Sequence, residues 1–282
     1  MGRLLQLHYN EAVPGKSVIT LTTDFGTADH FVGVLKGVIL RINPDAELVD
    51  ISHQVAEFEI EDGAFTLAQS YGYFPPGTIH LVVVDPGVGS SRRPIVVSAG
   101  AYRFVAPDNG VLSAIYDREE SVEVRHITAA HYFLSPVSHT FHGRDIFAPV
   151  AAWLSRGVKA DSLGACITDY VRAPLPKVEC VSPGLWRGVV LKVDRFGNLV
   201  TNITPRDVPG LCQTHPRDFR IEISGREIGR LCLSYLEASP SEIFAILGSS
   251  GYLEISMSRG SAAQTLKAKR GTALTIRLGV ED

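Results

Sequence analysis

Ile79-His80-Leu81-Val82-Val83-Val84-Asp85 is the most apolar stretch of the chain, and it ends on a carboxylate. A continuous apolar run of this kind predicts a strand that is covered on both faces. Residues 18–22 and 48–51 predict two further strands. Between the three strands, apolar residues recur at helical spacing over residues 31–39 and 60–68. Strands that alternate with helices predict right-handed βαβ crossovers and a largely parallel sheet.

Working outward, residues 94–98 and 102–106 predict a hairpin, and residues 111–116 and 146–154 predict two helices. A cluster of prolines follows, and we place a domain boundary near residues 174–185. Beyond it the pattern indicates only short strands separated by turns, over residues 189–193, 199–203, 219–223, 227–231, 243–247, 252–255 and 275–278.

Short strands at such spacing are typical of a small sandwich or barrel. The predicted fold class is therefore α/β. We expect an N-terminal α/β domain with a largely parallel sheet over residues 17–178, and a smaller C-terminal all-β, barrel-like domain over residues 185–282.

Composition excludes several classes of protein. The 282 residues carry 27 Lys and Arg against 30 Asp and Glu, a net charge of −3, which argues against a general nucleic-acid binder. No apolar run approaches the ~18 residues that span a bilayer, and the first 15 residues do not resemble a signal peptide. Four scattered cysteines, none in a Cys-x-x-Cys pair, predict reduced thiols in a cytoplasmic protein; they are Cys166, Cys180, Cys212 and Cys232.

Two acids follow predicted strands. Ligands bind at the carboxyl ends of parallel strands, and Asp24 and Asp85 stand at such ends. A carboxylate there can bind ribose hydroxyls, orient a cation or hold a metal. For Asp24, a helix cap or turn is an equally good interpretation.

One loop combines a carboxylate, two glycines, two hydroxyls and two arginines; its sequence is Asp85-Pro86-Gly87-Val88-Gly89-Ser90-Ser91-Arg92-Arg93. Gly87 and Gly89 allow a tight turn, which brings Arg92 back toward Asp85. The loop lacks the Gly-Lys-Ser/Thr ending of a phosphate-binding loop and the last glycine of the dinucleotide fingerprint. The alternative is a surface turn with a structural salt bridge.

Three other segments carry polar groups. In Phe141-His142-Gly143-Arg144-Asp145, the histidine at a helix entrance can face a ligand or be structural, and Asp145 can cap the helix. In residues 194–202, an acid, an aromatic ring and an amide share what can also be a simple hairpin turn. Residues 249–252 (Ser-Ser-Gly-Tyr) offer hydroxyls and backbone donors for a small carboxylate.

Taken in order, five motifs resemble those of the S-adenosyl-L-methionine (SAM) hydroxide adenosyltransferases, which are SAM hydrolases related to fluorinases and chlorinases. The motifs are Thr22-Thr23-Asp24-Phe25-Gly26, Val84-Asp85-Pro86-Gly87-Val88-Gly89, Ala106-Pro107-Asp108-Asn109-Gly110, Phe141-His142-Gly143-Arg144-Asp145 and residues 194–198. The resemblance implies an N-terminal α/β domain and a C-terminal barrel-like domain. It also implies a homotrimer that binds SAM between the N-terminal domain of one subunit and the C-terminal domain of its neighbour.

The resemblance assigns roles to residues. Asp85, Arg92 and His142 match the catalytic set of the hydrolases, Asp24 the acid that holds the ribose hydroxyls, and Phe58 an aromatic wall beside the ribose. Asp194 matches the acid that meets the methionine ammonium, Asn198 an adenine-binding amide and Tyr235 an aromatic that stacks on adenine. Ser249 and Ser250 match the carboxylate-binding pair, although halogenases carry arginine at the second position. The expected substrate-binding set is Asp24, Phe58, Phe141, Gly143, Asp194, Asn198, Tyr235, Ser249 and Ser250.

The chain departs from the halogenases at the nucleophile. They carry Tyr, Tyr and Ser where this chain has Asp85, His142 and Gly143. A carboxylate repels an incoming halide and tolerates water, so the sequence favours hydrolysis to adenosine and L-methionine. Water must then be oriented for attack at ribose C5′. We expect Arg92 to supply positive charge, with either Asp85 or His142 accepting the proton.

We expect no metal or redox cofactor, because methionine leaves as a neutral thioether. Three alternatives stay open: a non-catalytic SAM or adenosine binder, a SAM-dependent halogenase, and a metal-dependent hydrolase. The last would use Asp24, Asp85, His53 and His142.

Overall fold

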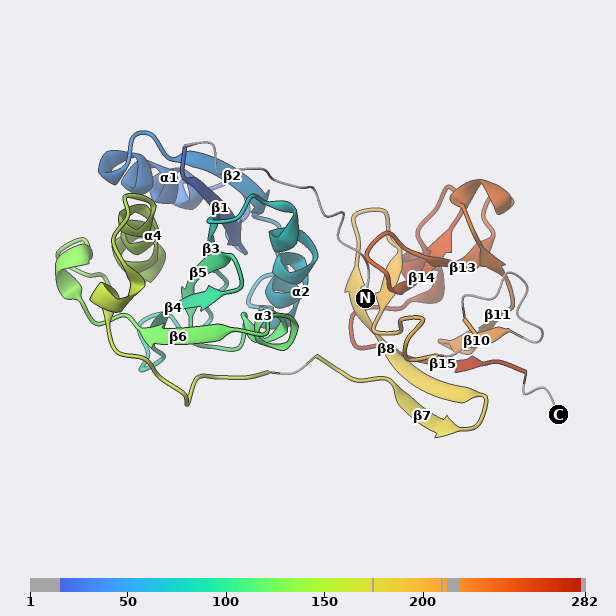
Figure 1. Ribbon diagram of the computed structural model, residues 1–282. Helices are drawn as coiled ribbons and strands as arrows, with labels where there is room; N and C mark the ends of the chain where they lie inside the picture. Colours follow the sequence, from blue (N-terminus) through green and yellow to red (C-terminus); the bar gives the residue numbers. More distant parts are fainter. Residues whose placement is uncertain (1–15, 174, 209, 212–218, 280–282) are drawn as a thin grey trace. The chain divides into compact units, whose positions relative to one another are not determined.

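The computed structural model describes residues 16–173, 175–208, 210–211 and 219–279, which form two compact units divided between Leu175 and Pro176 (Figure 1). Each unit has its own core of buried aliphatic and aromatic side chains. Two separately packed units in a chain of this length agree with the usual size of a domain.

The N-terminal unit is built on a six-stranded sheet in the order β2-β1-β3-β5-β4-β6. Its strands are β1 (Val18–Thr23), β2 (Glu47–Ser52), β3 (Ile79–Val83), β4 (Pro94–Ala99), β5 (Tyr102–Pro107) and β6 (Val122–His126). The β1–β2, β1–β3 and β3–β5 pairs are parallel, whereas β4 is antiparallel to both of its neighbours. The largely parallel sheet is therefore confirmed.

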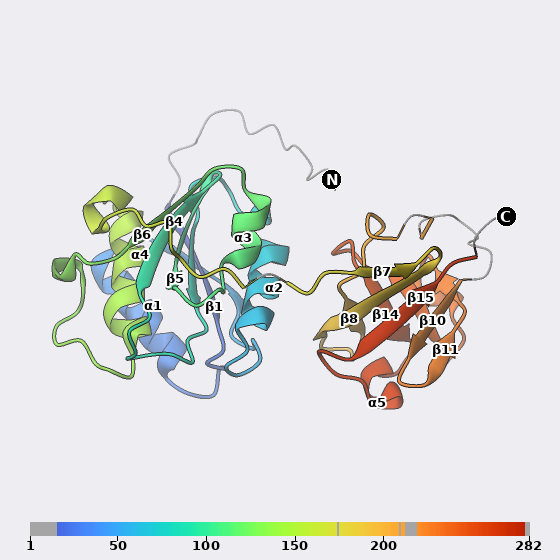
Figure 2. The ribbon, with the colours of Figure 1, turned by 90° about the horizontal axis from the view of Figure 1, so that it is seen from below.

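Helices cover both faces of this sheet (Figure 2). Helix α1 (Phe31–Ile42) and α4 (Ala148–Ser155) pack on one face with Leu81 and Val83, while α2 (Ile60–Ser70) and α3 (Ser113–Arg118) pack on the other with Val82 and Val84. Because successive side chains of a strand point to opposite faces, a strand between two helical layers must be apolar throughout. All five residues of β3 are buried, which explains its sequence.

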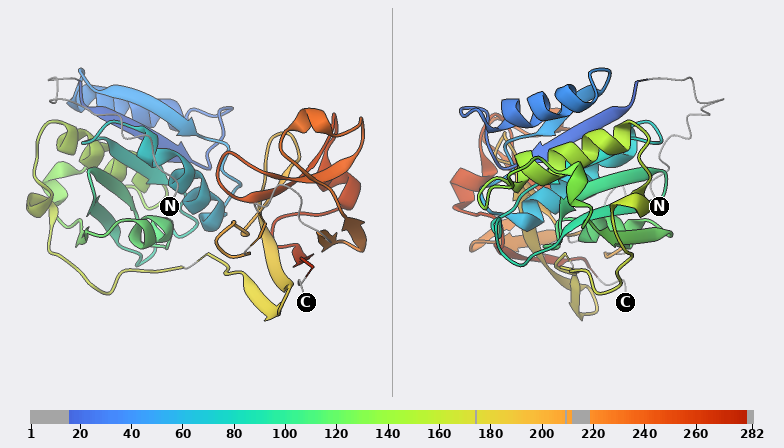
Figure 3. Two further views of the ribbon diagram at one scale, coloured as in Figure 1. Left: turned by 45° about the vertical axis from the view of Figure 1, so that its right-hand side comes forward. Right: turned by 90° about the vertical axis from the view of Figure 1, so that its left-hand side faces the viewer.

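The C-terminal unit is a curled, mainly antiparallel nine-stranded sheet (Figure 3). Its path is β11-β10-β15-β8-β9-β14-β13-β12, with β7 paired to β8. The strands are β7 (Glu179–Ser182), β8 (Leu185–Val193), β9 (Leu199–Thr201), β10 (Arg220–Ile223), β11 (Arg226–Ile228), β12 (Leu231–Cys232), β13 (Ile243–Leu247), β14 (Leu253–Met257) and β15 (Ala273–Arg277). The barrel-like second domain and the α/β class are confirmed.

Several elements differ from the prediction. The expected strand over residues 227–231 is two strands, β11 and β12, which lie at different places in the sheet. Strands β6 and β7 and helix α5 (Ala262–Leu266) were not predicted. All four residues of β7 are exposed, so no apolar alternation marks the strand in the sequence.

Cys166, Cys180 and Cys232 are free thiols, and Cys212 lies outside the described residues. Within the part of the chain that the structure describes, no helix is long and apolar enough to cross a membrane.

Candidate functional site

Asp85, Arg92 and His142 meet where β3 ends. The Arg92 guanidinium donates to both carboxylate oxygens of Asp85, with Nε 2.9 Å from Oδ1 and Nη2 2.5 Å from Oδ2. The same Nη2 lies 2.8 Å from Nδ1 of His142. The Arg92 and Asp85 side chains are only 8% and 5% exposed. The predicted salt bridge is therefore buried rather than on the surface, and it is joined to the histidine.

Gly89 shapes the loop that carries Arg92. Gly89 has φ +78°, and a Cβ there would lie 2.2 Å from the carbonyl oxygen of His139. Only glycine allows so close a contact in this left-handed conformation. The contact joins the loop to the segment that leads into His142, although 50 residues separate Arg92 from His142 in the sequence.

The contact between Arg92 and His142 determines which nitrogen of the ring carries the proton. Arginine has only donors and stays charged, so Nδ1 must accept, and the neutral ring carries its hydrogen on Nε2. Burial lowers the pKa of His142, and the neighbouring Arg92 charge lowers it further against the opposing effect of Asp85. His142 is thus a neutral ring that donates through Nε2.

Arg92 also has a hydrogen-bond donor that is not used within the described residues. Its buried Nη1 has no hydrogen-bond partner among the described residues, and its guanidinium lies 5.1 Å from the centre of the Phe147 ring. A buried donor without a partner is costly unless something binds it. The trio therefore offers a positive donor beside a carboxylate and a neutral histidine.

Asp24 lies in the loop after β1 and links it to the loop after β2. Its Oδ2 accepts from the backbone N–H of Phe58 at 3.0 Å. Burial raises the pKa of Asp24, the bond from Phe58 opposes this, and the nearby Asp85 charge adds to the rise. The helix-cap interpretation is wrong, since His30 is the N-cap of α1.

Phe58 is held in an unusual conformation. It has φ +65°, and the residue is 70% exposed. A bulky residue rarely adopts the left-handed region, and such strain concentrates at functional sites. Asp24 stabilises the backbone that presents this ring.

Phe141 and Gly143 flank His142 inside an aromatic cluster. The Phe141 ring lies 5.3 Å from Phe31 and 6.0 Å from Phe25, edge-on to both. A Cβ at Gly143 would lie 3.3 Å from the Phe141 ring, so a larger residue at this position would crowd the ring. Asp145 does not cap a helix. It lies within the π-helical turn Gly143–Phe147, and its carboxylate accepts from the Ser138 amide.

His53 is engaged away from the trio. Its Nδ1 lies 2.8 Å from the Thr23 hydroxyl and its Nε2 3.0 Å from Asp50. Among the described residues, no group of three or more His, Cys, Asp or Glu could hold a metal ion. The metal-binding set of Asp24, Asp85, His53 and His142 is thus not assembled.

The C-terminal unit holds a second group of predicted residues. In the β8–β9 turn, Asp194 accepts from the amides of Phe196 and Asn198, each at 2.8 Å, and from the Asn198 side chain at 2.8 Å. These are the bonds of a structural hairpin turn, and they also hold the acid and the amide in place. Gly197 (φ +85°) completes the turn, where a Cβ would lie 2.1 Å from the Ser261 hydroxyl.

Tyr235, Ser249 and Ser250 belong to the same unit. Tyr235 is 49% exposed, and its hydroxyl lies 3.3 Å from a carboxylate oxygen of Glu254. Ser249 and Ser250 form the turn between β13 and β14, and neither hydroxyl makes a hydrogen bond with a described residue. Glu254, which accepts the hydrogen bond from Tyr235, was not predicted as a site residue. A lone acid between Leu253 and Ile255, inside a strand, is the signal that could have identified it.

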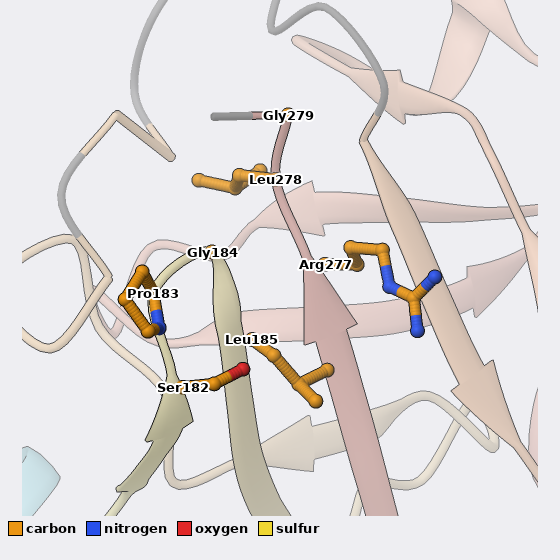
Figure 4. Close-up of a pocket in the computed structure, with 7 residues that line it drawn as sticks. All are labelled: Ser182, Pro183, Gly184, Leu185, Arg277, Leu278 and Gly279. Carbon is orange, nitrogen blue, oxygen red and sulfur yellow. The ribbon is translucent and has the colours of Figure 1, made fainter. Parts of the chain in front are cut away.

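A hollow in the C-terminal unit contains none of these residues (Figure 4). It lies between the β7–β8 turn and the end of β15, where Ser182, Leu185 and Arg277 line it together with neighbouring residues. No buried charged group faces it, so we do not assign it to the site.

Comparison with known proteins identifies the architecture. The model of the SAM hydroxide adenosyltransferase N-terminal domain matches residues 19–164, and that of the C-terminal domain matches residues 188–275. The chain is 36% identical to an (R)-S-adenosyl-L-methionine hydrolase of Salinispora tropica over 267 residues, covering 93% of this chain and 98% of that protein. It is 33% identical to a protein of the same name from Thermus thermophilus, with 88% and 95% covered.

More distant relatives include a fluorinase from an Actinoplanes species, which is 25% identical over 93% of this chain and 98% of that protein. Among solved structures, a conserved protein from Thermotoga maritima superposes with a TM-score of 0.85 at 37% identity, covering 92% of this chain and 99% of that one.

Proposed function

The chain belongs to the SAM hydroxide adenosyltransferase family, and we propose that it hydrolyses S-adenosyl-L-methionine to adenosine and L-methionine. The relatives named as hydrolases match it at 33–36% identity over most of its length. One observation supports hydrolysis above all: the buried Asp85–Arg92–His142 trio at the end of β3. A carboxylate in this position disfavours a halide and accepts water.

In the proposed reaction, water attacks ribose C5′ opposite the sulfonium. The O–C5′ bond forms as the C5′–S bond breaks, and the electron pair of that bond becomes the second lone pair of the methionine thioether. The water proton must pass to a base. Since the leaving group is neutral, the enzyme needs no acid at sulfur, and its work is to orient and deprotonate water.

The hydrogen-bond pattern favours Asp85 as the base. His142 accepts from Arg92 at Nδ1 and holds its proton on Nε2, so the neutral ring can only donate to the water. Asp85 keeps lone pairs beyond those that Arg92 uses. We therefore assign proton acceptance to Asp85, orientation of the water to His142, and stabilisation of the developing hydroxide to Arg92.

The remaining assignments follow the family. Asp24 would bind the ribose hydroxyls through Oδ1, which does not hold Phe58, while Phe58, Phe141 and Gly143 would line the nucleoside. Asp194, Asn198, Tyr235, Ser249 and Ser250 would bind the methionine and adenine ends. These two groups belong to different units, which supports a homotrimer with shared sites. We also propose a cytoplasmic location and a reaction without metal or redox cofactor.

The test is to incubate the purified protein with SAM and separate the products by chromatography. We expect equal amounts of adenosine and methionine. Arg92→Ala should lose most of the turnover while it still binds adenosine, whereas Arg103→Ala, an exposed arginine on β5, serves as the matched control.

Other outcomes would redirect the assignment. SAM binding without turnover would identify a sensor, and a halogenated nucleoside formed in excess halide would identify a halogenase. Loss of activity with a chelator would contradict the metal-free reaction. Full activity of Arg92→Ala would remove Arg92 from the mechanism.

A further inference from the structure

Glu254 is a buried acid in the middle of an apolar sheet. It lies on β14, paired with Val200 of β9 and Ile246 of β13, and is only 8% exposed. Acidic side chains are almost never buried without a partner. Burial raises the pKa of Glu254, and the hydrogen bond from Tyr235 opposes this rise. Burying an acid within a sheet costs free energy, so its presence here is best explained by a specific role.

The carboxylate contacts a residue expected to touch the substrate. Tyr235 donates its hydroxyl to Glu254 Oε2 at 3.3 Å, and its ring rests edge-on against the buried Phe244, with centroids 6.0 Å apart. The hydroxyl end and one edge of the ring are thereby restrained, while the residue as a whole remains 49% exposed. These two contacts restrain the orientation of an aromatic ring on which a base can stack.

The other carboxylate oxygen supports the turn that carries Ser249 and Ser250. A Cβ at Gly248 would lie 1.9 Å from Glu254 Oε1, so Oε1 occupies the space that any other residue at 248 would need. The turn closes through Gly248 N–H to Tyr252 O and Gly251 N–H to Gly248 O, both at 2.9 Å. Glu254 therefore contacts Tyr235 on one side and the start of the serine turn on the other.

We propose that Glu254 is a positioning residue of the substrate site, holding Tyr235 and the Ser249–Ser250 turn in the geometry that binds the adenine and methionine ends of SAM. This inference rests on the proposed function, and it adds a residue that does not itself touch the reacting atoms. The affected quantity is binding rather than the chemical step, because the bond-making trio lies in the other unit.

The experiment compares Glu254→Ala, Glu254→Gln, Tyr235→Phe and the double variant Glu254→Ala/Tyr235→Phe in the full-length protein. We measure kcat and KM for SAM, and adenosine affinity by calorimetry. Glu254→Ala should raise KM and weaken adenosine binding by about tenfold, with kcat changed far less. Glu254→Gln keeps an acceptor for the tyrosine hydroxyl and should restore most of the affinity.

The double variant separates positioning from general damage to the fold. If Glu254 acts through Tyr235, the two changes should not add, because the first already removes the bond that the second removes. Glu222→Ala, an exposed glutamate on β10, is the matched control. Unchanged adenosine affinity in Glu254→Ala, or strictly additive losses, would overturn the inference. Adenosine affinity is measured without turnover, so an inactive wild-type protein would contradict the proposed function and leave this test standing.

Discussion

Replacing His80 should remove a large part of the acid sensitivity of folding. His80 lies on β3 with no exposed surface, its Nδ1 2.7 Å from the Thr20 hydroxyl and its ring stacked 5.0 Å from Phe104. Burial lowers its pKa from 6.5 to about 3. The folded state therefore resists protonation at a position where the unfolded chain accepts a proton readily.

The free energy of unfolding depends on pH because the folded and unfolded states bind protons differently. Between pH 6.5 and 3 the unfolded state binds more protons, so stability rises with pH. The stability that the neutral His80 contributes to the folded state is fully present above pH 6.5 and is lost as the pH falls toward 3. The full shift of 3.5 pKa units corresponds to about 5 kcal/mol at ~1.36 kcal/mol per unit. Between pH 7.5 and pH 5, the loss from this residue is about 2 kcal/mol.

The assay is urea unfolding of the wild type, His80→Phe and His80→Asn at a series of pH values from 7.5 to 5. Each substitution also lowers the free energy of unfolding by an amount that does not depend on pH. Phe leaves the Thr20 hydroxyl without its partner, and Asn leaves a cavity where the imidazole ring was. Both should nevertheless lose about 2 kcal/mol less than the wild type over this range. Equal pH slopes in all three proteins would refute the reasoning, whatever their absolute stabilities.

Three further outcomes follow. If the proposed sites are shared between subunits, mixed assemblies of Arg92→Ala and Asn198→Ala subunits should regain activity that neither variant has alone. Each variant keeps intact the unit that carries the substitution in the other. Mixed assemblies that stay inactive would argue against a shared site. Gly89→Ala should destabilise the fold by ~1–3 kcal/mol and lower turnover, because its Cβ meets the His139 carbonyl. Gly33→Ala, at an exposed position of α1, should be tolerated; equal thermal melting of the two variants would contradict this. The kcat/KM of the wild type should fall as the pH drops through the pKa of His142, which lies below its ordinary value, because protonation at Nδ1 breaks the bond from Arg92; an identical acid limb in His142→Gln would rule His142 out as its origin.

Local sequence was enough to predict the frame of the N-terminal unit. The apolar run over residues 79–84 marks β3 because its alternate side chains enter two different cores. The glycines before Arg92 indicated a return toward Asp85, and the two groups are in contact. Strand β7 gave no such signal, since none of its residues is buried. The roles of the site residues stay predictions.

The sequence by itself determined the fold class, the family and the identity of the polar groups at the strand ends, because these depend on local periodicity and on short motifs. Only the tertiary structure decided that His142 accepts a bond from Arg92, that Asp24 restrains Phe58, and that Glu254 is buried beneath Tyr235. These three pairs join residues that lie 50, 34 and 19 positions apart in the sequence, and loops and strand pairing bring them together. Which side chains meet across such separations depends on packing, and so does the pKa of each group, because neighbouring charges and burial are properties of the folded chain.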